Sequence, residues 1–80
     1  MDRTRLEQHL RLVDDEIAAN EGQMRRLCEL IAKLERGGQD SSEMRKRLIA
    51  LEAFQALRLA DRELIQQELA LFRQKRKKIW

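Results

Sequence analysis

The chain contains 80 residues, 39% of them charged and 42% hydrophobic, with a formal net charge of +3 at pH 7. This length allows one domain with a marginal core, and a composition rich in Leu, Ala, Glu, Arg and Lys is typical of long helices. No apolar run approaches the roughly 20 residues that a membrane-spanning helix requires. The N-terminal residues lack the apolar segment of a secretory signal, and the single cysteine, Cys28, excludes an intramolecular disulfide. We therefore expect a cytoplasmic, all-α protein in which residues 1–80 form one domain.

A first helix is predicted over about residues 4–36, where apolar residues recur at alternating steps of four and three. This spacing is typical of a helix that packs along one narrow seam. Thr4 with Glu7 fits an N-terminal capping box, and Asp2 is a competing cap. Asn20-Glu21-Gly22 is a weak point, but the heptad phase continues through it, so we favour one continuous helix over two. The seam residues are Leu6, Leu10, Val13, Ile17, Asn20, Met24, Leu27, Ile31 and Leu34.

Residues 37–41 interrupt the helical pattern and contain two of the three glycines. Gly37 suits the left-handed residue that commonly ends a helix. A second helix is predicted over about residues 42–77, with Asp40 or Ser41 as its cap and Asp40 with Glu43 as a capping box. Because short connections between long helices make antiparallel neighbours, the fold class is an antiparallel two-helix hairpin.

The second helix carries two adjacent apolar stripes, and one partner helix covers only one stripe. We infer that the first stripe packs on helix 1 and that the second packs on another subunit, so that two hairpins form a four-helix bundle. A dimer is favoured over a higher oligomer or a monomer. The first stripe is Met44, Leu48, Leu51, Ile65, Leu69 and Phe72, interrupted by Gln55, Arg58 and Arg62. The second stripe, our candidate oligomer face, is Ala50, Phe54, Leu57, Leu64 and Leu71.

A polar layer is predicted at the middle of the hairpin. Folding the chain about the turn places Asn20, the one polar seam residue of helix 1, opposite Arg58, with Asp61 and Arg62 close by. A buried polar seam residue penalises slipped or wrongly paired assemblies, so we interpret this layer as register control. The alternative is a small polar ligand pocket between the helices.

The C-terminal stretch 73–80 is strongly basic and should lie beside the start of helix 1. Cations near a helix C-terminus complement its dipole, which is the interpretation we favour. The alternative is a patch that binds the phosphates of nucleic acid; we do not favour binding to a membrane surface. The candidate basic patch comprises Arg3, Arg5, Arg73, Lys75, Arg76, Lys77 and Lys78.

No catalytic, cofactor-binding or metal-binding residues are predicted. His9 is the only histidine and is expected to be exposed, and Cys28 is expected to be a buried, inert thiol. The Glu-x-x-His units of di-iron bundles are absent, as are phosphate-binding loops. Small helical enzymes such as chorismate mutases use bundle arginines, and Arg11, Arg58 and Arg62 permit that comparison without supporting it.

Three segments carry a resemblance to known proteins: Asp2-Arg3 with Leu6-Glu7-Gln8-His9-Leu10, Ile31-Ala32-Lys33-Leu34-Glu35-Arg36 leading to Gly38-Gln39-Asp40, and Leu57 to Asp61-Arg62. They resemble short helical-hairpin proteins encoded by alphaproteobacteria, especially rhizobial relatives, a family with no assigned activity. The resemblance covers most of the chain and implies a bacterial helical hairpin. The usual Gly-His-Asp of that turn is here Gly38-Gln39-Asp40, so a role for a turn histidine would not apply.

These features predict a non-enzymatic, oligomeric interaction or scaffold protein that needs no cofactor and engages an unknown protein partner. The first alternative is a hairpin dimer that binds RNA or DNA through its basic open end. A small helical-bundle enzyme is the second alternative, which we do not favour.

Overall fold

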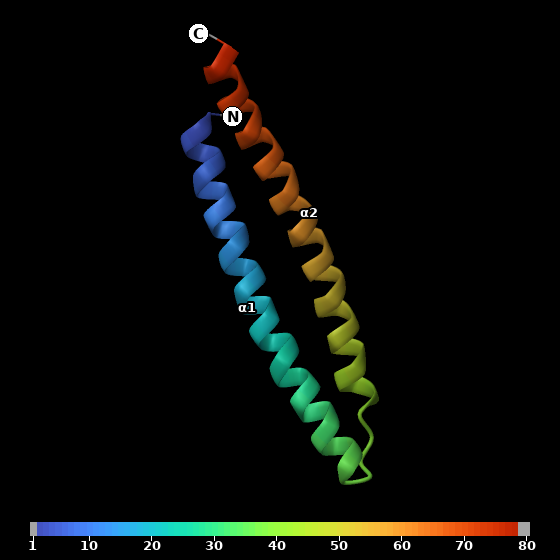
Figure 1. Ribbon diagram of the computed structural model, residues 1–80. Coiled ribbons are helices and arrows are strands. Elements are labelled where there is room, and N and C mark those ends of the chain that lie inside the picture. Colours follow the sequence, from blue (N-terminus) through green and yellow to red (C-terminus); the bar gives the residue numbers. More distant parts are fainter. Residues whose placement is uncertain (1, 79–80) are drawn as a thin grey trace.

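The computed structural model describes residues 2–78, and the side chains of residues 2–74. The chain forms two antiparallel helices, α1 (Arg3–Arg36) and α2 (Ser42–Lys78), which a short connection joins (Figure 1). The molecule is a rod of 67 × 16 × 14 Å. The all-α helical hairpin is therefore confirmed, with α1 beginning one residue before the predicted position 4 and α2 ending one residue after the predicted position 77. Within the described residues, neither helix has an apolar stretch long enough to cross a membrane.

Asp2 is the residue that caps α1. Its backbone is extended, and its Oδ1 accepts a hydrogen bond of 2.9 Å from the backbone N–H of Arg5. The predicted capping box of Thr4 and Glu7 is wrong, because Thr4 already lies inside the first helical turn. Aspartate is among the best N-caps, and its charge also complements the positive end of the helix dipole.

The helix α1 runs without a break through Asn20-Glu21-Gly22, as the heptad phase predicts. A glycine inside a helix costs about 1 kcal/mol relative to alanine. The seam on either side of Gly22 offsets this cost, because Ile17, Leu27 and Ile31 are all buried. The packing of the apolar seam thus decides the local structure at this glycine.

A paired hydrogen-bond motif ends α1. The Gln39 N–H donates to the Leu34 carbonyl at 2.8 Å, and the Gly38 N–H donates to the Glu35 carbonyl at 3.1 Å. This arrangement requires a left-handed residue just past the helix. That residue is Gly38, with φ of 70°, whereas Gly37 has φ of −82°. The expectation that Gly37 would be left-handed is therefore wrong by one residue.

The start of α2 is held by Asp40 rather than by a full capping box. Asp40 Oδ1 accepts hydrogen bonds from the Ser42 N–H at 3.0 Å and from the Ser42 hydroxyl at 2.5 Å. The predicted reciprocal bond from Glu43 is not formed, and the Glu43 carboxylate instead lies 3.5 Å from Lys46 Nζ. Ser41 turns its hydroxyl toward α1, where it donates to Glu35 Oε2 at 3.1 Å.

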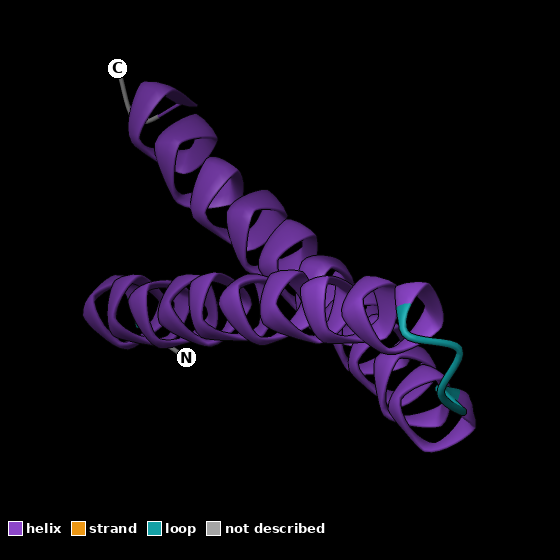
Figure 2. Cartoon of the chain, turned by 90° about the horizontal axis from the view of Figure 1, so that it is seen from below, coloured by secondary structure: helices purple, strands orange, loops and turns teal. Residues whose placement is uncertain are grey.

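The connection runs back beside the last turn of α1 before α2 begins (Figure 1). As a result, α2 is displaced along α1 by about one helical turn from the position predicted by counting residues from the turn. The end of α2 projects beyond the start of α1. The two helices also cross rather than run strictly parallel, as seen in Figure 2.

The core is a single narrow seam between the helices. Leu6, Val13, Ile17 and Ile65 form its buried cluster, and Leu10, Leu69 and Phe72 pack against that cluster. Val13 is completely buried and Leu6 is 2% exposed. The first stripe of α2 faces this seam, because Met44, Leu48, Leu51, Leu69 and Phe72 are half-buried and Ile65 is buried.

Candidate functional site

Asn20 is the centre of the polar layer and is only 3% exposed. Its Nδ2 donates to the backbone carbonyl of Leu51 at 3.0 Å and to Gln55 Oε1 at 2.9 Å. Gln55 Nε2 in turn donates to Glu21 Oε1 at 3.2 Å. The buried Nδ2 donors are thus satisfied by α2, and these two hydrogen bonds fix the position of α2 along α1 at this residue.

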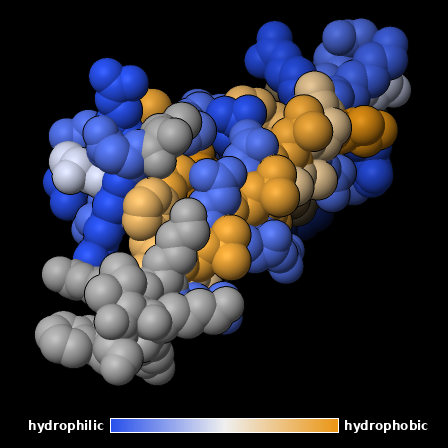
Figure 3. Space-filling model, turned by 90° about the horizontal axis from the view of Figure 1, so that it is seen from above, coloured by the Kyte–Doolittle hydropathy of each residue, from blue (hydrophilic) through white to orange (hydrophobic). Residues whose placement is uncertain are grey.

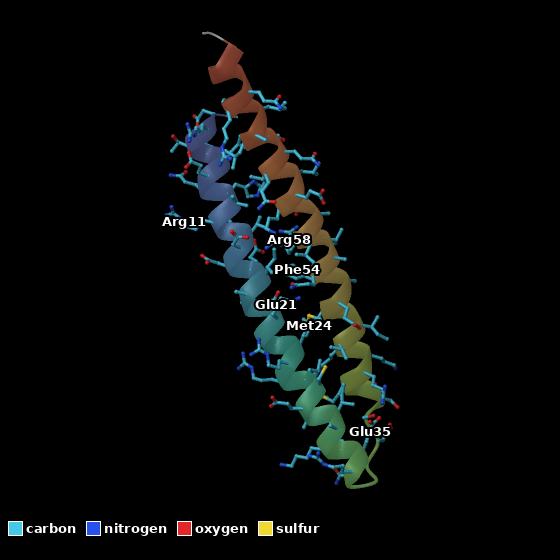
Figure 4. The ribbon with its side chains drawn as sticks, in the orientation of Figure 1. Arg11, Glu21, Met24, Glu35, Phe54 and Arg58 are labelled. Atoms are coloured by element: carbon cyan, nitrogen blue, oxygen red, sulfur yellow. The ribbon has the colours of Figure 1, made fainter. Side chains whose placement is uncertain are left out.

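Arg58 lies about one turn farther from the hairpin turn and forms a separate cluster. Its Nη2 is 2.8 Å from Asp61 Oδ2, and its Nη1 is 3.6 Å from Glu16 Oε2. The guanidinium carbon is 5.3 Å from the centroid of the Phe54 ring. Arg58 Nε is buried and has no hydrogen-bond partner. Figure 4 shows Phe54 and Arg58 between the two helices.

The structure therefore corrects which residues of the two helices meet in the predicted polar layer. Asn20 faces Gln55, three residues before the predicted partner Arg58. Arg58 and Asp61 do pair with each other, and Arg62 lies 3.6 Å from Asp14 of α1. The displacement of α2 explains the difference, because it moves each α2 residue about one turn along α1. Gln55 was visible in the sequence as a polar interruption of the first stripe, but its pairing depended on the path of the connection.

The candidate oligomer face is exposed along the length of α2. Leu57, Leu64 and Leu71 are 63%, 58% and 55% exposed, and Phe54 is 38% exposed. Ala50 and Phe54 border an open groove between the helices, with two adjoining sections of about 500 and 410 Å³. On the α1 side, Ala19 and Leu30 line the same groove.

We name as the apolar face the side of the hairpin that carries this groove. Of the eight large exposed hydrophobic side chains within residues 2–74, six lie on it and only Ile49 and Leu59 do not. Leu12 belongs to it because it precedes the groove residue Ala19 by seven, a spacing that keeps residues on one side of a helix. Figure 3 shows apolar side chains reaching the surface in a band between hydrophilic ones. The six residues are Leu12, Leu30, Phe54, Leu57, Leu64 and Leu71.

Glu35 ties the end of α1 to the start of α2. Its Oε2 accepts a hydrogen bond from Arg45 Nη2, with further contacts of 3.1 Å to Arg45 Nε and 3.1 Å to the Ser41 hydroxyl. Hydrogen bonding to Arg45, and then to Ser41, lowers the pKa of the Glu35 carboxyl below its ordinary value. The Ser42 side chain and backbone N–H likewise lower the pKa of Asp40.

The basic patch is described only in part. Arg3, Arg5 and Arg73 are exposed at the open end, where the two chain ends lie (Figure 1). Arg3 Nε is 3.2 Å from Glu7 Oε1, so part of its charge is compensated within α1. The side chains of Lys75, Arg76, Lys77 and Lys78 lie outside the described residues.

The remaining candidates for chemistry are dispersed. His9 is exposed, as expected, whereas Cys28 is exposed and not buried. Cys28 follows the seam residue Leu27 by about 100° around the helix, on a side that α2 does not cover. Arg11 lies on the side of α1 away from α2, so it does not converge with Arg58 and Arg62 (Figure 4). The described residues include no group of three metal-ligating side chains.

The fold and its surface define a two-helix hairpin with a hydrogen-bonded asparagine between the helices and an exposed apolar face. No protein-family model, curated protein or solved structure matches the chain. The resemblance to alphaproteobacterial hairpins therefore stays a prediction.

Replacing Asn20 tests what the polar layer contributes. We expect Asn20→Leu to raise the free energy of unfolding by up to about 1 kcal/mol, because burying leucine contributes about 1.5–3 kcal/mol and the two lost hydrogen bonds cost about 1 kcal/mol each. The adjoining groove leaves room for the larger side chain. Asn20→Ala, which removes the bonds without adding apolar volume, should instead lower it by about 1–3 kcal/mol. Urea unfolding at fixed protein concentration measures both, and a leucine variant less stable than wild type would contradict this account.

Lowering the pH should reduce the stability that Glu35 and Asp40 contribute at the turn. Because their pKa values are lower in the folded than in the unfolded chain, the unfolded chain takes up protons first. Their contribution to stability is complete above the ordinary pKa values and is lost as the pH falls below about 5 and through the lowered ones. Thermal melts are recorded from neutral pH to about pH 3. At neutral pH, Glu35→Gln and Arg45→Gln should both have lower melting temperatures than wild type, and on acidification their melting temperatures should fall less than that of wild type. Profiles parallel to that of wild type would rule out this role.

Proposed function

We propose that the chain is a non-enzymatic interaction or scaffold module that self-associates through its apolar face into a dimeric four-helix bundle. The observation that carries this proposal is the gathering of six of the eight exposed large hydrophobic side chains on one side of the hairpin. Soluble monomers rarely expose contiguous apolar patches larger than a few hundred Å². A face of this kind therefore favours a protein partner over bulk water.

The thinness of the hairpin core supports the same proposal. Within the described residues, six buried apolar side chains and a few half-buried neighbours hold two long helices together. A single core of this size supplies little net stability, and oligomerisation is a usual remedy. Packing a second hairpin on the groove would cover Leu30, Phe54 and Leu57 and convert one seam into a bundle core.

The proposed compartment is the cytoplasm. Cys28 is an exposed, free thiol, and a reducing compartment preserves such a thiol. We propose that the surface outside the apolar face is where a bundle of this kind would meet a further protein partner.

Charge placed on the apolar face should separate the subunits. We expect wild-type protein to sediment as a dimer at tens of micromolar and Leu57→Glu to shift it to monomer, because each subunit would bury an unpaired carboxylate. Ile49→Glu is the matched control: Ile49 is on the same helix and is 65% exposed, against 63% for Leu57, but lies off the apolar face. Sedimentation equilibrium measures all three.

Two results would contradict this proposal. One is a wild-type protein that stays monomeric at those concentrations. The other is equal dissociation by Leu57→Glu and Ile49→Glu, which would show that added charge acts without regard to the face.

Nucleic-acid binding is the second candidate function. It is favoured by the antiparallel arrangement of α1 and α2, which places exposed Arg3, Arg5 and Arg73 toward one end of the rod (Figure 1). Phosphate contacts release counterions, so this binding should weaken steeply with salt. We expect a structured RNA to bind at about 50 mM salt and to lose about ten-fold or more in affinity at about 200 mM. A fluorescence anisotropy titration measures this, with Arg3→Gln/Arg5→Gln weaker than wild type. Binding that ignores salt, or none at low salt, would eliminate this candidate.

A further inference from the structure

On the apolar face, two basic residues lie nearer the turn, and acidic residues lie farther from it. Arg26 of α1 and Arg47 of α2 line the same section of the groove, in the half nearer the turn. Arg26 Nε also donates to the Gly22 carbonyl at 3.3 Å, which keeps its guanidinium against α1. Both helices are therefore positive at this level.

Farther from the turn, both helices become negative. Glu16 of α1 and Asp61 of α2 both contact Arg58, which places them at one level. Two carboxylates share one guanidinium there, leaving net negative charge. Glu68 follows Asp61 by seven residues, so it lies on the same side of α2 two turns on, and it is exposed.

From this arrangement we infer that the occupant of the apolar face is a second copy of the chain with its turn at the opposite end. The inference rests on the self-association proposed above and adds its orientation. Had both turns lain at the same end, the positive level of one copy would meet the positive level of the other. This would hold whichever helices touched at these two levels, because α1 and α2 are both positive at Arg26 and Arg47 and both negative at Glu16 and Asp61. Reversing one copy brings the positive level against the negative one.

The sequence along α2 fits such a reversal about Leu57. Arg47, Phe54, Asp61 and Glu68 recur at steps of seven, as do Ala50, Leu57 and Leu64. A two-fold axis beside Leu57 brings Leu57 against its own copy, places Arg47 close to Glu68 and places the small Ala50 opposite the larger Leu64. Phe54 falls close to Asp61, which pairs with Arg58 of its own chain.

This pairing has the form of an isologous interface, in which each contact occurs twice. From Arg47 to Glu68 the paired segment extends about 31 Å at 1.5 Å per residue. Large apolar residues occupy its centre and opposite charges its ends, which is the usual division of an interface into an apolar core and a polar rim.

Charge reversal tests the pairing of Arg47 with Glu68. We expect Arg47→Glu and Glu68→Arg each to weaken dimerisation roughly ten-fold, because the two-fold axis repeats each like-charge contact. The double variant should recover the wild-type dissociation constant. With turns at the same end, single reversals would leave dimerisation unchanged or tighten it, and the double variant would show no rescue. Sedimentation equilibrium on the full chain gives the dissociation constants.

Cross-linking reads the orientation directly. In a Cys28→Ser background, chains carrying Ala50→Cys are mixed with size-tagged chains carrying Leu64→Cys and treated with a short bismaleimide. We expect products that join one chain of each kind to dominate, whereas turns at the same end would give products between identical chains. Chains carrying Ala56→Cys, on the other side of α2, should give no product with Leu64→Cys chains. A dimer that cross-links only between identical chains overturns the orientation alone, whereas a protein that sediments as a monomer overturns the proposed function.

Discussion

The path of the chain between the two helices controls every other contact in the hairpin. Left-handed Gly38 ends α1, and the next three residues run back beside its last turn until Ser42 begins α2. This return sets the level of α2, so that Asn20 meets Gln55 and Arg58 meets Glu16. Glu35 holds the return in place, because it accepts from Ser41 within the connection and from Arg45 on α2.

The helices and their contact stripes could be predicted from the sequence because both follow from periodicity. Val13 and Ile65 lie in the seam that the heptad spacing predicts, and Leu57 lies outside it. The register could not be predicted as well, since counting residues from a turn assumes that α2 starts level with the end of α1. Likewise, Cys28 adjoins the seam in sequence, yet its side chain points about 100° away from Leu27. Nearness in sequence does not give burial on a helix.

The polar layer illustrates how a satisfied amide differs from an ion pair in the same seam. Asn20 is buried and makes two good bonds to α2, so a slip of α2 would leave its donors unpaired. Arg58 instead keeps 28% of its side chain exposed and shares its charge between Glu16 and Asp61 at unequal distances. Its Nε has no partner even in this register. The hydrogen bonds of Asn20 therefore favour the register that the connection sets, whereas the Arg58 cluster leaves one buried nitrogen unpaired in that register.

In the proposed dimer, self-association would contribute to the stability of the fold. Leu57 and Leu64 contribute nothing to the seam, but they would be buried by a second copy, so their burial would add to stability only in the dimer. A partner that binds only the folded state, and not the unfolded chain, stabilises the folded state. At saturating concentrations this stabilisation grows with the logarithm of the partner's concentration. The chain would then be most stable where it is most abundant. A scaffold built this way would assemble only above a threshold concentration, with the charges at Arg47 and Glu68 selecting the orientation in which it does so.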